Sequence, residues 1–113
     1  MLNRKGTKVY NMAEDFECIA SFIDYDGKLI AMPAKKKRQL YAIWYIASKI
    51  DSGKTYTERE INEVINSLTV FKDPATLRRQ MYDRFLLDRS PDCKQYRMRS
   101  DMPTLEDFVQ NNT

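Results

Sequence analysis

Residues 55–99 read TYTEREINEVINSLTVFKDPATLRRQMYDRFLLDRSPDCKQYRMR, and this stretch decides the fold. Thr57-Glu-Arg-Glu60 is a capping box, in which a threonine and a glutamate three residues later satisfy the free N–H groups at a helix start. Asp73-Pro74 places an N-cap residue before a proline at the first helical position. Together these signals predict two successive helices, the second over residues 74–84.

A β-hairpin is expected after the second helix. Leu86–Arg89 and Lys94–Arg99 have the composition and partial alternation of short strands. Ser90-Pro91-Asp92 lies between them and is a turn cluster. The chain is therefore expected to leave the second helix as one strand and return as another.

The segments upstream predict a further helix and a shorter extension. Apolar residues recur at helical spacing ahead of Ser52-Gly53, which we expect to end the helix. This apolar face consists of Leu40, Ile43, Trp44, Ala47 and Ile50. We also expect a short helix that begins at Asn11, and a short strand over residues 28–32 that Pro33 ends.

This order of elements predicts an α+β fold: a winged helix-turn-helix-like single domain with an extra N-terminal helix and short strand. The domain is expected to span residues 11–99, preceded by a flexible arm at 1–10. Residues 100–113 form an acidic tail. Within the tail, we expect one amphipathic turn packed on the body, formed by Leu105, Phe108 and Val109.

The composition excludes several classes of function. The chain has 113 residues, no histidine, two cysteines without a CxxC spacing, and three glycines that form no phosphate-binding loop. These absences remove histidine-based catalysis and cysteine-rich zinc sites, so we expect no enzyme, no cofactor and no metal. No segment resembles a signal peptide or a membrane span, which predicts a cytoplasmic protein with reduced thiols and no membrane partner.

The distribution of charge favours an anionic partner. Segments 35–54 and 72–99 carry net charges of +5 and +4 in a chain whose net charge is +3. In a helix-turn-helix, the later helix of the pair enters the major groove of double-stranded DNA. We therefore expect base contacts from the outward and flanking residues of helix 74–84: Thr76, Arg78, Arg79 and Gln80. The expected phosphate contacts are Lys35, Lys36, Lys37, Arg38, Arg89, Lys94, Arg97 and Arg99.

The helical wheel of residues 74–84 separates two faces. Leu77, Met81 and Phe85 are expected to face the core, while Thr76, Arg79 and Asp83 point outward. At the start of the upstream helix, Lys35–Arg38 places four cations where the helix dipole is positive. Two interpretations of that run stay open. Either a bound phosphate relieves the repulsion, or the lysines extend into solvent at small cost.

The stretch from about Phe22 to Arg97 resembles the bacterial domain of unknown function 2087 family. The blocks that carry the resemblance are Asp26–Leu29, Pro33–Lys35, Tyr56–Asn62 (YTEREIN), Ala75–Arg79 (ATLRR), Leu86–Arg89 and Tyr96-Arg97. The resemblance implies a small winged-helix-type domain, often found in proteins that look like bacterial transcriptional regulators. It implies no catalytic residues.

The chain departs from that family's pattern at two positions. Phe85 stands where members usually have a glycine before the Leu-Leu pair, so the exit from helix 74–84 is expected to differ. Asp92-Cys93-Lys94 replaces the usual glycine of the hairpin, which puts the tightness of the wing in question.

The sequence supports two hypotheses of function. The first is a DNA-binding transcriptional regulator, or an accessory module of one, with a homodimer as a possible state. The second is a protein–protein interaction module on the same scaffold, since the outward carboxylate of Asp83 would oppose phosphate. The acidic tail raises a related idea, that residues 100–113 cover the basic surface as an internal mimic of DNA.

Overall fold

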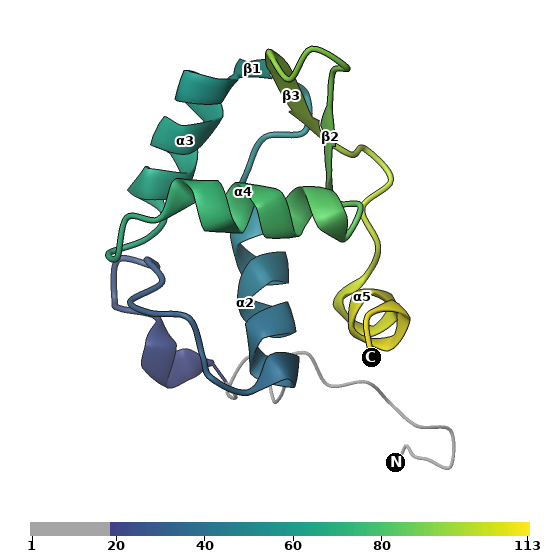
Figure 1. Ribbon diagram of the computed structural model, residues 1–113. Coiled ribbons are helices and arrows are strands. Elements are labelled where there is room, and N and C mark those ends of the chain that lie inside the picture. The colour runs from purple at the N-terminus through teal and green to yellow at the C-terminus, as the bar shows by residue number, and fades with distance from the viewer. Residues whose placement is uncertain (1–18) are drawn as a thin grey trace.

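The computed structural model describes residues 19–113, so the expected arm and the expected helix start at Asn11 lie outside the described residues. Within that range the fold is α+β, as predicted. The elements in chain order are η1 (Ala20–Phe22), α2 (Lys36–Ser48), β1 (Tyr56–Thr57), α3 (Glu58–Ser67), α4 (Pro74–Asp83), β2 (Leu87–Arg89), β3 (Gln95–Met98) and α5 (Leu105–Asn111). Figure 1 shows α4 crossing α2, with the strands beyond them at one end of the molecule.

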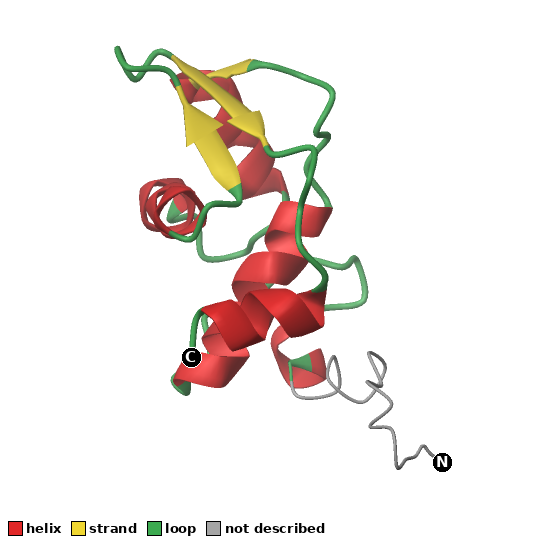
Figure 2. Ribbon diagram, turned by 90° about the vertical axis from the view of Figure 1, so that its right-hand side faces the viewer, coloured by secondary structure: helices red, strands yellow, loops and turns green. Residues whose placement is uncertain are grey.

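The three strands form one antiparallel sheet in the order β1-β3-β2. Tyr96 in β3 lies opposite Tyr56 on one side and Arg89 on the other. The sheet stands over the end of the helical part, with α3 and α4 close beneath it (Figure 2). The expected hairpin is confirmed, and it turns back toward the N-terminal end of α3.

The helix starts that the sequence predicts are confirmed. The Thr57 hydroxyl accepts a hydrogen bond from the Glu60 backbone N–H at 3.1 Å, and the Thr57 N–H donates to the Glu60 carboxylate at 2.8 Å. Asp73 accepts a bond from the Thr76 N–H, with Pro74 as the first helical residue. Each such cap contributes about 1 kcal/mol, and together they fix where α3 and α4 begin.

Two upstream predictions are wrong. Residues 28–32 form no strand; Leu29 makes only isolated bridges to Ile23 and Thr69. Neither bridge extends into a ladder, because Ile23 directly follows a single turn of 3-10 helix and Thr69 lies in the loop after α3. The helix expected to end at Ser52-Gly53 ends at Ser48, because the N–H groups of residues 49 and 50 bond back to residues 46 and 47 and tighten the last turn.

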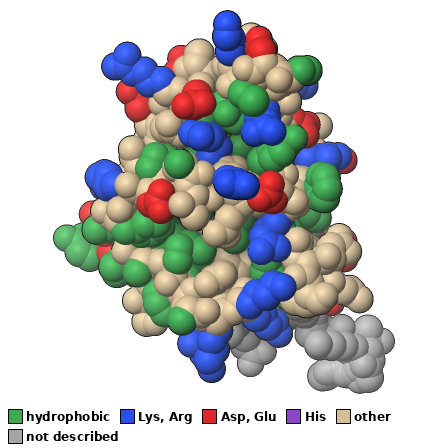
Figure 3. All heavy atoms as spheres, in the orientation of Figure 1, with side chains coloured by type: hydrophobic (Ala, Val, Ile, Leu, Met, Phe, Trp, Pro, Cys, Tyr) green, Lys and Arg blue, Asp and Glu red, His purple; other side chains and the backbone are tan. Residues whose placement is uncertain are grey.

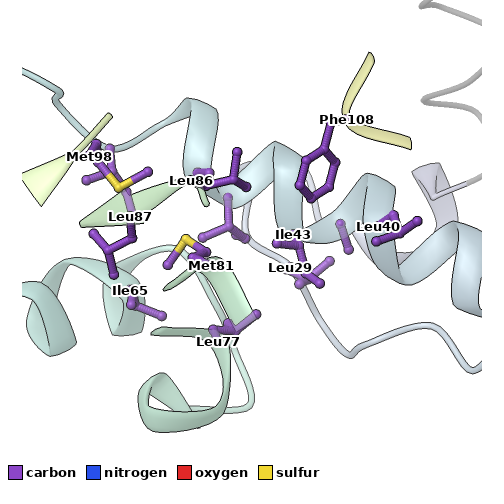
Figure 4. Packing of buried hydrophobic residues seen from close by; sticks show 14 of the residues in the cluster. Leu29, Leu40, Ile43, Ile65, Leu77, Met81, Leu86, Leu87, Met98 and Phe108 are labelled. Carbon is purple, nitrogen blue, oxygen red and sulfur yellow. The ribbon is translucent and has the colours of Figure 1, made fainter. Parts of the chain in front are cut away.

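The core joins both halves of the chain. Leu40 and Ile43 of α2, Ile65 of α3, and Leu77 and Met81 of α4 are almost completely buried. Figure 4 shows them with Leu29, Leu86, Leu87, Met98 and Phe108 in one continuous cluster. The apolar face predicted for α2, and that predicted for α4 apart from Phe85, are therefore the faces that pack.

The acidic segment 100–113 is folded onto the body. Leu105 and Phe108 of α5 are almost fully buried, Val109 is 8 % exposed, and α5 packs on α2, which confirms the expected amphipathic turn. The Trp44 indole N–H donates to the Pro103 carbonyl at 2.9 Å. Removing a buried phenylalanine costs about 3–5 kcal/mol, so deleting this segment would disrupt the core.

The end of α4 corrects the expectation that Phe85 faces the core. Phe85 is 73 % exposed and has a φ of 65°, in the left-handed region. The Leu86 N–H bonds the Met81 carbonyl, and the Phe85 N–H bonds the Tyr82 carbonyl, so the helix ends in a Schellman motif. The left-handed residue turns its own side chain outward and directs Leu86 into the core.

Replacement of Phe85 by glycine is expected to stabilise the fold. A side chain in the left-handed region costs about 1 kcal/mol, and the exposed ring of Phe85 contributes little burial in return. We expect Phe85→Gly to melt about 4 °C above Phe85→Ala, measured by thermal unfolding. The alanine variant is the matched control because it loses the ring but keeps a β-carbon. Equal melting temperatures would contradict a conformational cost at this position.

Candidate nucleic-acid interface

A groove of about 370 Å³ lies between α4 and the hairpin. Its lining residues are Ala75, Arg78, Arg79, Tyr82, Asp83, Arg89 and Tyr96, and we call it the α4–hairpin groove. Three guanidinium groups and one carboxylate thus meet around two tyrosines. The structure therefore brings together Arg78 and Arg79, which the sequence assigned to bases, and Arg89, which it assigned to phosphates.

Arg78 is held from two sides. Its guanidinium donates a hydrogen bond to the Asn62 side-chain oxygen on α3 and lies 5.4 Å from the centre of the Tyr96 ring. The side chain is half-buried, because α4 packs against α3 at this point. The hydrogen bond to Asn62 uses one of the N–H groups of Arg78, and a bidentate contact to a base needs two parallel N–H groups of one guanidinium.

Arg89 reaches the groove because of the pleat of β2. Its cross-strand partner is Tyr96, and residues opposite each other in a sheet project to the same face. The guanidinium lies 4.1 Å from the centre of the Tyr82 ring on α4, a close cation–π contact. Arg89 therefore closes the groove from the hairpin side.

Arg79 lies on the outward face of α4, as predicted. It pairs with Asp83 one turn later at 3.9 Å, with 84 % of the arginine side chain and 59 % of the aspartate side chain exposed. Such an exposed pair contributes little to stability, so another anion can replace the carboxylate at small cost. Thr76 is also exposed, whereas Gln80 is half-buried beside this face.

The remaining cations of the hairpin lie on its outer side. Gln95 and Arg97 are exposed while Tyr96 and Met98, next to them along β3, are buried. Asp88 lies opposite Arg97 and Arg89 lies opposite Tyr96, so the pleat separates Arg97 from Arg89. A shallow depression of about 430 Å³ runs over these residues to Arg99 and Asp101. The cations expected to form one wing surface are therefore spread over two surfaces, and Arg89 lines both the outer depression and the α4–hairpin groove.

Arg99 is already paired within the chain. Its Nε donates to Oδ1 of Asp101 and its Nη2 donates to Oδ2, each at 3.1 Å. The hydrogen bonds from Arg99 lower the pKa of Asp101, and the same pair raises the pKa of Arg99. A carboxylate of the acidic segment thus occupies a guanidinium that was expected to contact phosphate.

Lys94 lies at the tip of the hairpin, where its side chain is exposed. Cys93 has a φ of 61°, so the position that was expected to loosen the turn is in the left-handed region that glycine favours. Asp92 accepts hydrogen bonds from the Ser90 hydroxyl at 2.5 Å and the Lys94 N–H at 3.1 Å. Both bonds hold the tip and lower the pKa of Asp92.

The four cations Lys35, Lys36, Lys37 and Arg38, which we call the α2 patch, lie at the other end of the molecule. The sheet and the start of α2 are at opposite ends in both ribbon views (Figures 1 and 2). The three lysines are exposed, Arg38 is half-buried, and no side chain caps the helix start. Figure 3 shows Lys and Arg spread from this end across α4 to the hairpin, with Asp and Glu among them.

Sequence reasoning missed four residues that shape the site: Asn62, Tyr82, Tyr96 and Asp101. Asn62 ends the YTEREIN block and Arg78 lies in the ATLRR block, so the two most specific blocks are joined by one hydrogen bond. The presence of both blocks in one chain was the sequence signal that could have pointed to a contact between Asn62 and Arg78. The contact of Asp101 with Arg99 is local, two positions apart, whereas the ring contacts of Tyr82 and Tyr96 depend on how the chain folds back on itself.

No helix among residues 19–113 has both the length and the apolar character to cross a bilayer. In the same range, no cluster of three or more acidic or cysteine side chains is positioned to hold a metal ion.

The pKa of Asp92 gives a pH-dependent prediction. Its pKa in the folded chain lies below the ordinary value of 3.8, so the carboxylate stabilises the hairpin tip above that pH. The contribution is lost as the pH falls through the lower, folded-state pKa. A carboxyl ¹³C NMR titration should give a midpoint below 3.8 that rises in Ser90→Ala, because the Ser90 hydroxyl is the largest cause of the shift. Ser67→Ala on α3 should leave it unchanged; an equal midpoint in Ser90→Ala would contradict this.

Comparison with known proteins gives one match. A family described as "Uncharacterized protein conserved in bacteria (DUF2087)" matches residues 28–98. No curated protein and no solved structure matches the chain. The matched range covers more than half of the sequence and runs from the segment before α2 to the end of β3, which confirms the resemblance drawn from the sequence blocks. The chain belongs to the DUF2087 family.

Proposed function

We propose that this domain is a winged helix that binds double-stranded DNA, as a transcriptional regulator or an accessory module of one. The order α2-β1-α3-α4-β2-β3, with the sheet order β1-β3-β2, supports this interpretation. In such an arrangement α4 is the recognition helix and the β2–β3 hairpin is the wing. The role is one of binding rather than of catalysis.

The observation that carries the proposal is the exposed face of α4. Arg79 and Thr76 project from it beside a groove that Arg89 closes from the hairpin. An arginine reads guanine bidentately, and Arg79 can do so by giving up its exposed pair with Asp83 at small cost. A threonine hydroxyl can bond to either base of a pair. Arg79 and Thr76, with Gln80 at the edge, are therefore the proposed base contacts.

The proposed phosphate contacts fall into separate surfaces. Arg97 and Lys94 are exposed on the outer hairpin, and the α2 patch lies at the far end of the molecule. A straight duplex on α4 would use the hairpin cations first, and the α2 patch would contribute only through a bent duplex or a second contact. Replacing the four α2 patch cations by glutamine therefore distinguishes a central role for that patch from a peripheral one.

Arg79 is the residue on which sequence preference is expected to depend. Binding to duplex DNA should weaken with salt, since each neutralised phosphate contributes about −0.9 to the slope of log K against log salt. Arg79→Ala should cost about 1–3 kcal/mol of discrimination between preferred and random duplex, measured by fluorescence anisotropy after selection of the preferred sequence.

Arg59→Ala is the matched control for Arg79→Ala. Arg59 on α3 is equally exposed and pairs with Glu63 in the same i, i+4 arrangement, at 3.5 Å, but it lines neither the groove nor the outer hairpin. If Arg79→Ala and Arg59→Ala behave alike, α4 is not the recognition helix. If no duplex binds at low salt, the proposed function is wrong.

A second candidate function, a protein–protein interaction module, is favoured by one specific observation. Phe85 exposes 73 % of its surface on a backbone conformation that is costly for phenylalanine, two positions after the exposed Asp83 in the sequence. An exposed aromatic that does not stabilise the fold is common in interaction surfaces. Failure to bind DNA would make this the leading function.

Mimicry of DNA by the acidic segment is best tested at Asp101, because deletion of residues 100–113 would disrupt the core. Asp101→Asn should release Arg99 for phosphate, raise DNA affinity several-fold at low salt and steepen the salt slope by about 0.9. The control is Glu106→Gln, an equal change of charge at an exposed position in the first turn of α5. Equal affinities of the two variants would exclude a masking role for Asp101.

A further inference from the structure

We propose that the α4–hairpin groove is a phosphate site, in which Arg78 and Arg89 together hold a single backbone phosphate of the bound DNA. This inference rests on the proposed function for the source of the phosphate. It also changes the role of Arg78 from a base contact to a phosphate contact. The argument comes from the different surroundings of the arginines in this part of the chain.

The arginines of this region fall into two kinds. Arg79 and Arg99 each have a carboxylate partner, Asp83 and Asp101. Arg78 and Arg89 line the groove, and neither forms an ion pair with any residue in the described range 19–113. An anion that contacts Arg78 and Arg89 therefore breaks no ion pair of theirs, although the carboxylate of Asp83 lines the same groove.

Both guanidinium groups are fixed in place before any ligand arrives. Tyr96 is buried in the sheet; Arg78 lies over its ring and Arg89 is its cross-strand partner. Arg89 is also stacked on Tyr82, and Arg78 is bonded to Asn62. Side chains that are already ordered lose less conformational entropy on binding, so the pair is suited to capture a ligand that makes few other contacts.

The geometry favours phosphate over a base edge. A base edge is read by one complete guanidinium fork, and the fork of Arg78 is partly used by Asn62. A phosphate group offers several oxygens in a tetrahedral arrangement, so two guanidinium groups that line one groove with Tyr96 can each contribute the N–H groups that remain. Asp83 also lines the groove, where its carboxylate pairs with Arg79 and repels an anion placed on that side of the groove.

The decisive variant is Arg89→Gln, since Arg89 is exposed and its loss leaves the core intact. We expect the salt slope for duplex binding to become shallower by about 0.9, with affinity falling by a similar factor on preferred and random duplexes. Arg59→Gln should keep both the slope and the affinity of the unmodified protein. An unchanged slope in Arg89→Gln would overturn the phosphate site, even if DNA binding itself is normal.

Tyr82 tests whether Arg89 is prearranged. Tyr82→Phe keeps the ring under the guanidinium and should bind DNA as the unmodified protein does. Tyr82→Leu removes the ring but no charge, so affinity should fall several-fold while the salt slope stays the same. If Tyr82 has only a structural role, Tyr82→Leu should lower the melting temperature but should not lower DNA affinity at an unchanged salt slope.

Arginine side-chain NMR separates failure of the site from failure of the proposed function. The Nε–Hε signals of Arg78 and Arg89 should shift on addition of duplex DNA and also of inorganic phosphate, while that of Arg59 stays in place. If phosphate shifts the two signals but duplex DNA does not bind, the DNA function is wrong and the groove takes a smaller phosphorylated ligand. If DNA binds and the two signals stay in place, the DNA function stands and the groove assignment is wrong.

Discussion

The left-handed turn at Phe85 determines where the hairpin lies relative to α4. The Schellman bonds from Phe85 and Leu86 end the helix within one residue, and they point Leu86 and then Leu87 into the core. Since strand residues alternate, burial of Leu87 also fixes the direction of Arg89, two residues later. The groove between α4 and the hairpin therefore depends on the position of this turn. Phenylalanine occupies the turn although a left-handed backbone is unfavourable for a residue with a side chain.

The pleat of the sheet then divides the charges of the hairpin. Tyr96 and Met98 are buried, so Gln95 and Arg97 must face outward, and the register of β2 places Asp88 with them. Of the two charged residues of β2, Arg89 faces α4, where its guanidinium lies over Tyr82, and Asp88 faces away. A shift of one residue in this register would exchange Arg89 and Asp88, and a carboxylate would replace the guanidinium over Tyr82. Core packing and surface chemistry are therefore set by the same register.

Local signals in the sequence predict most of the fold, and they fail where the chain ends an element. Caps at Thr57 and Asp73 predict the two helix starts, because the bonds involved span only three residues. A helical wheel extended to Phe85 is wrong because it assumes helical geometry beyond Arg84, where the backbone changes hand. The strand expected over residues 28–32 is wrong because alternation alone cannot supply a partner strand.

The candidate site is less predictable than the fold for a related reason. Composition and spacing identify the arginines, but whether an arginine is available to a ligand depends on contacts between distant residues. Asn62 and Arg78 are 16 positions apart, and Arg89 meets Tyr82 only through the turn at Phe85. Net charge per segment also overstates the basic surface, since Asp101 lies outside segment 72–99 and neutralises Arg99 within it. The guanidinium groups best suited to contact a phosphate are therefore those of Arg78 and Arg89, which tyrosine rings hold in place and which form no ion pair with a carboxylate among the described residues.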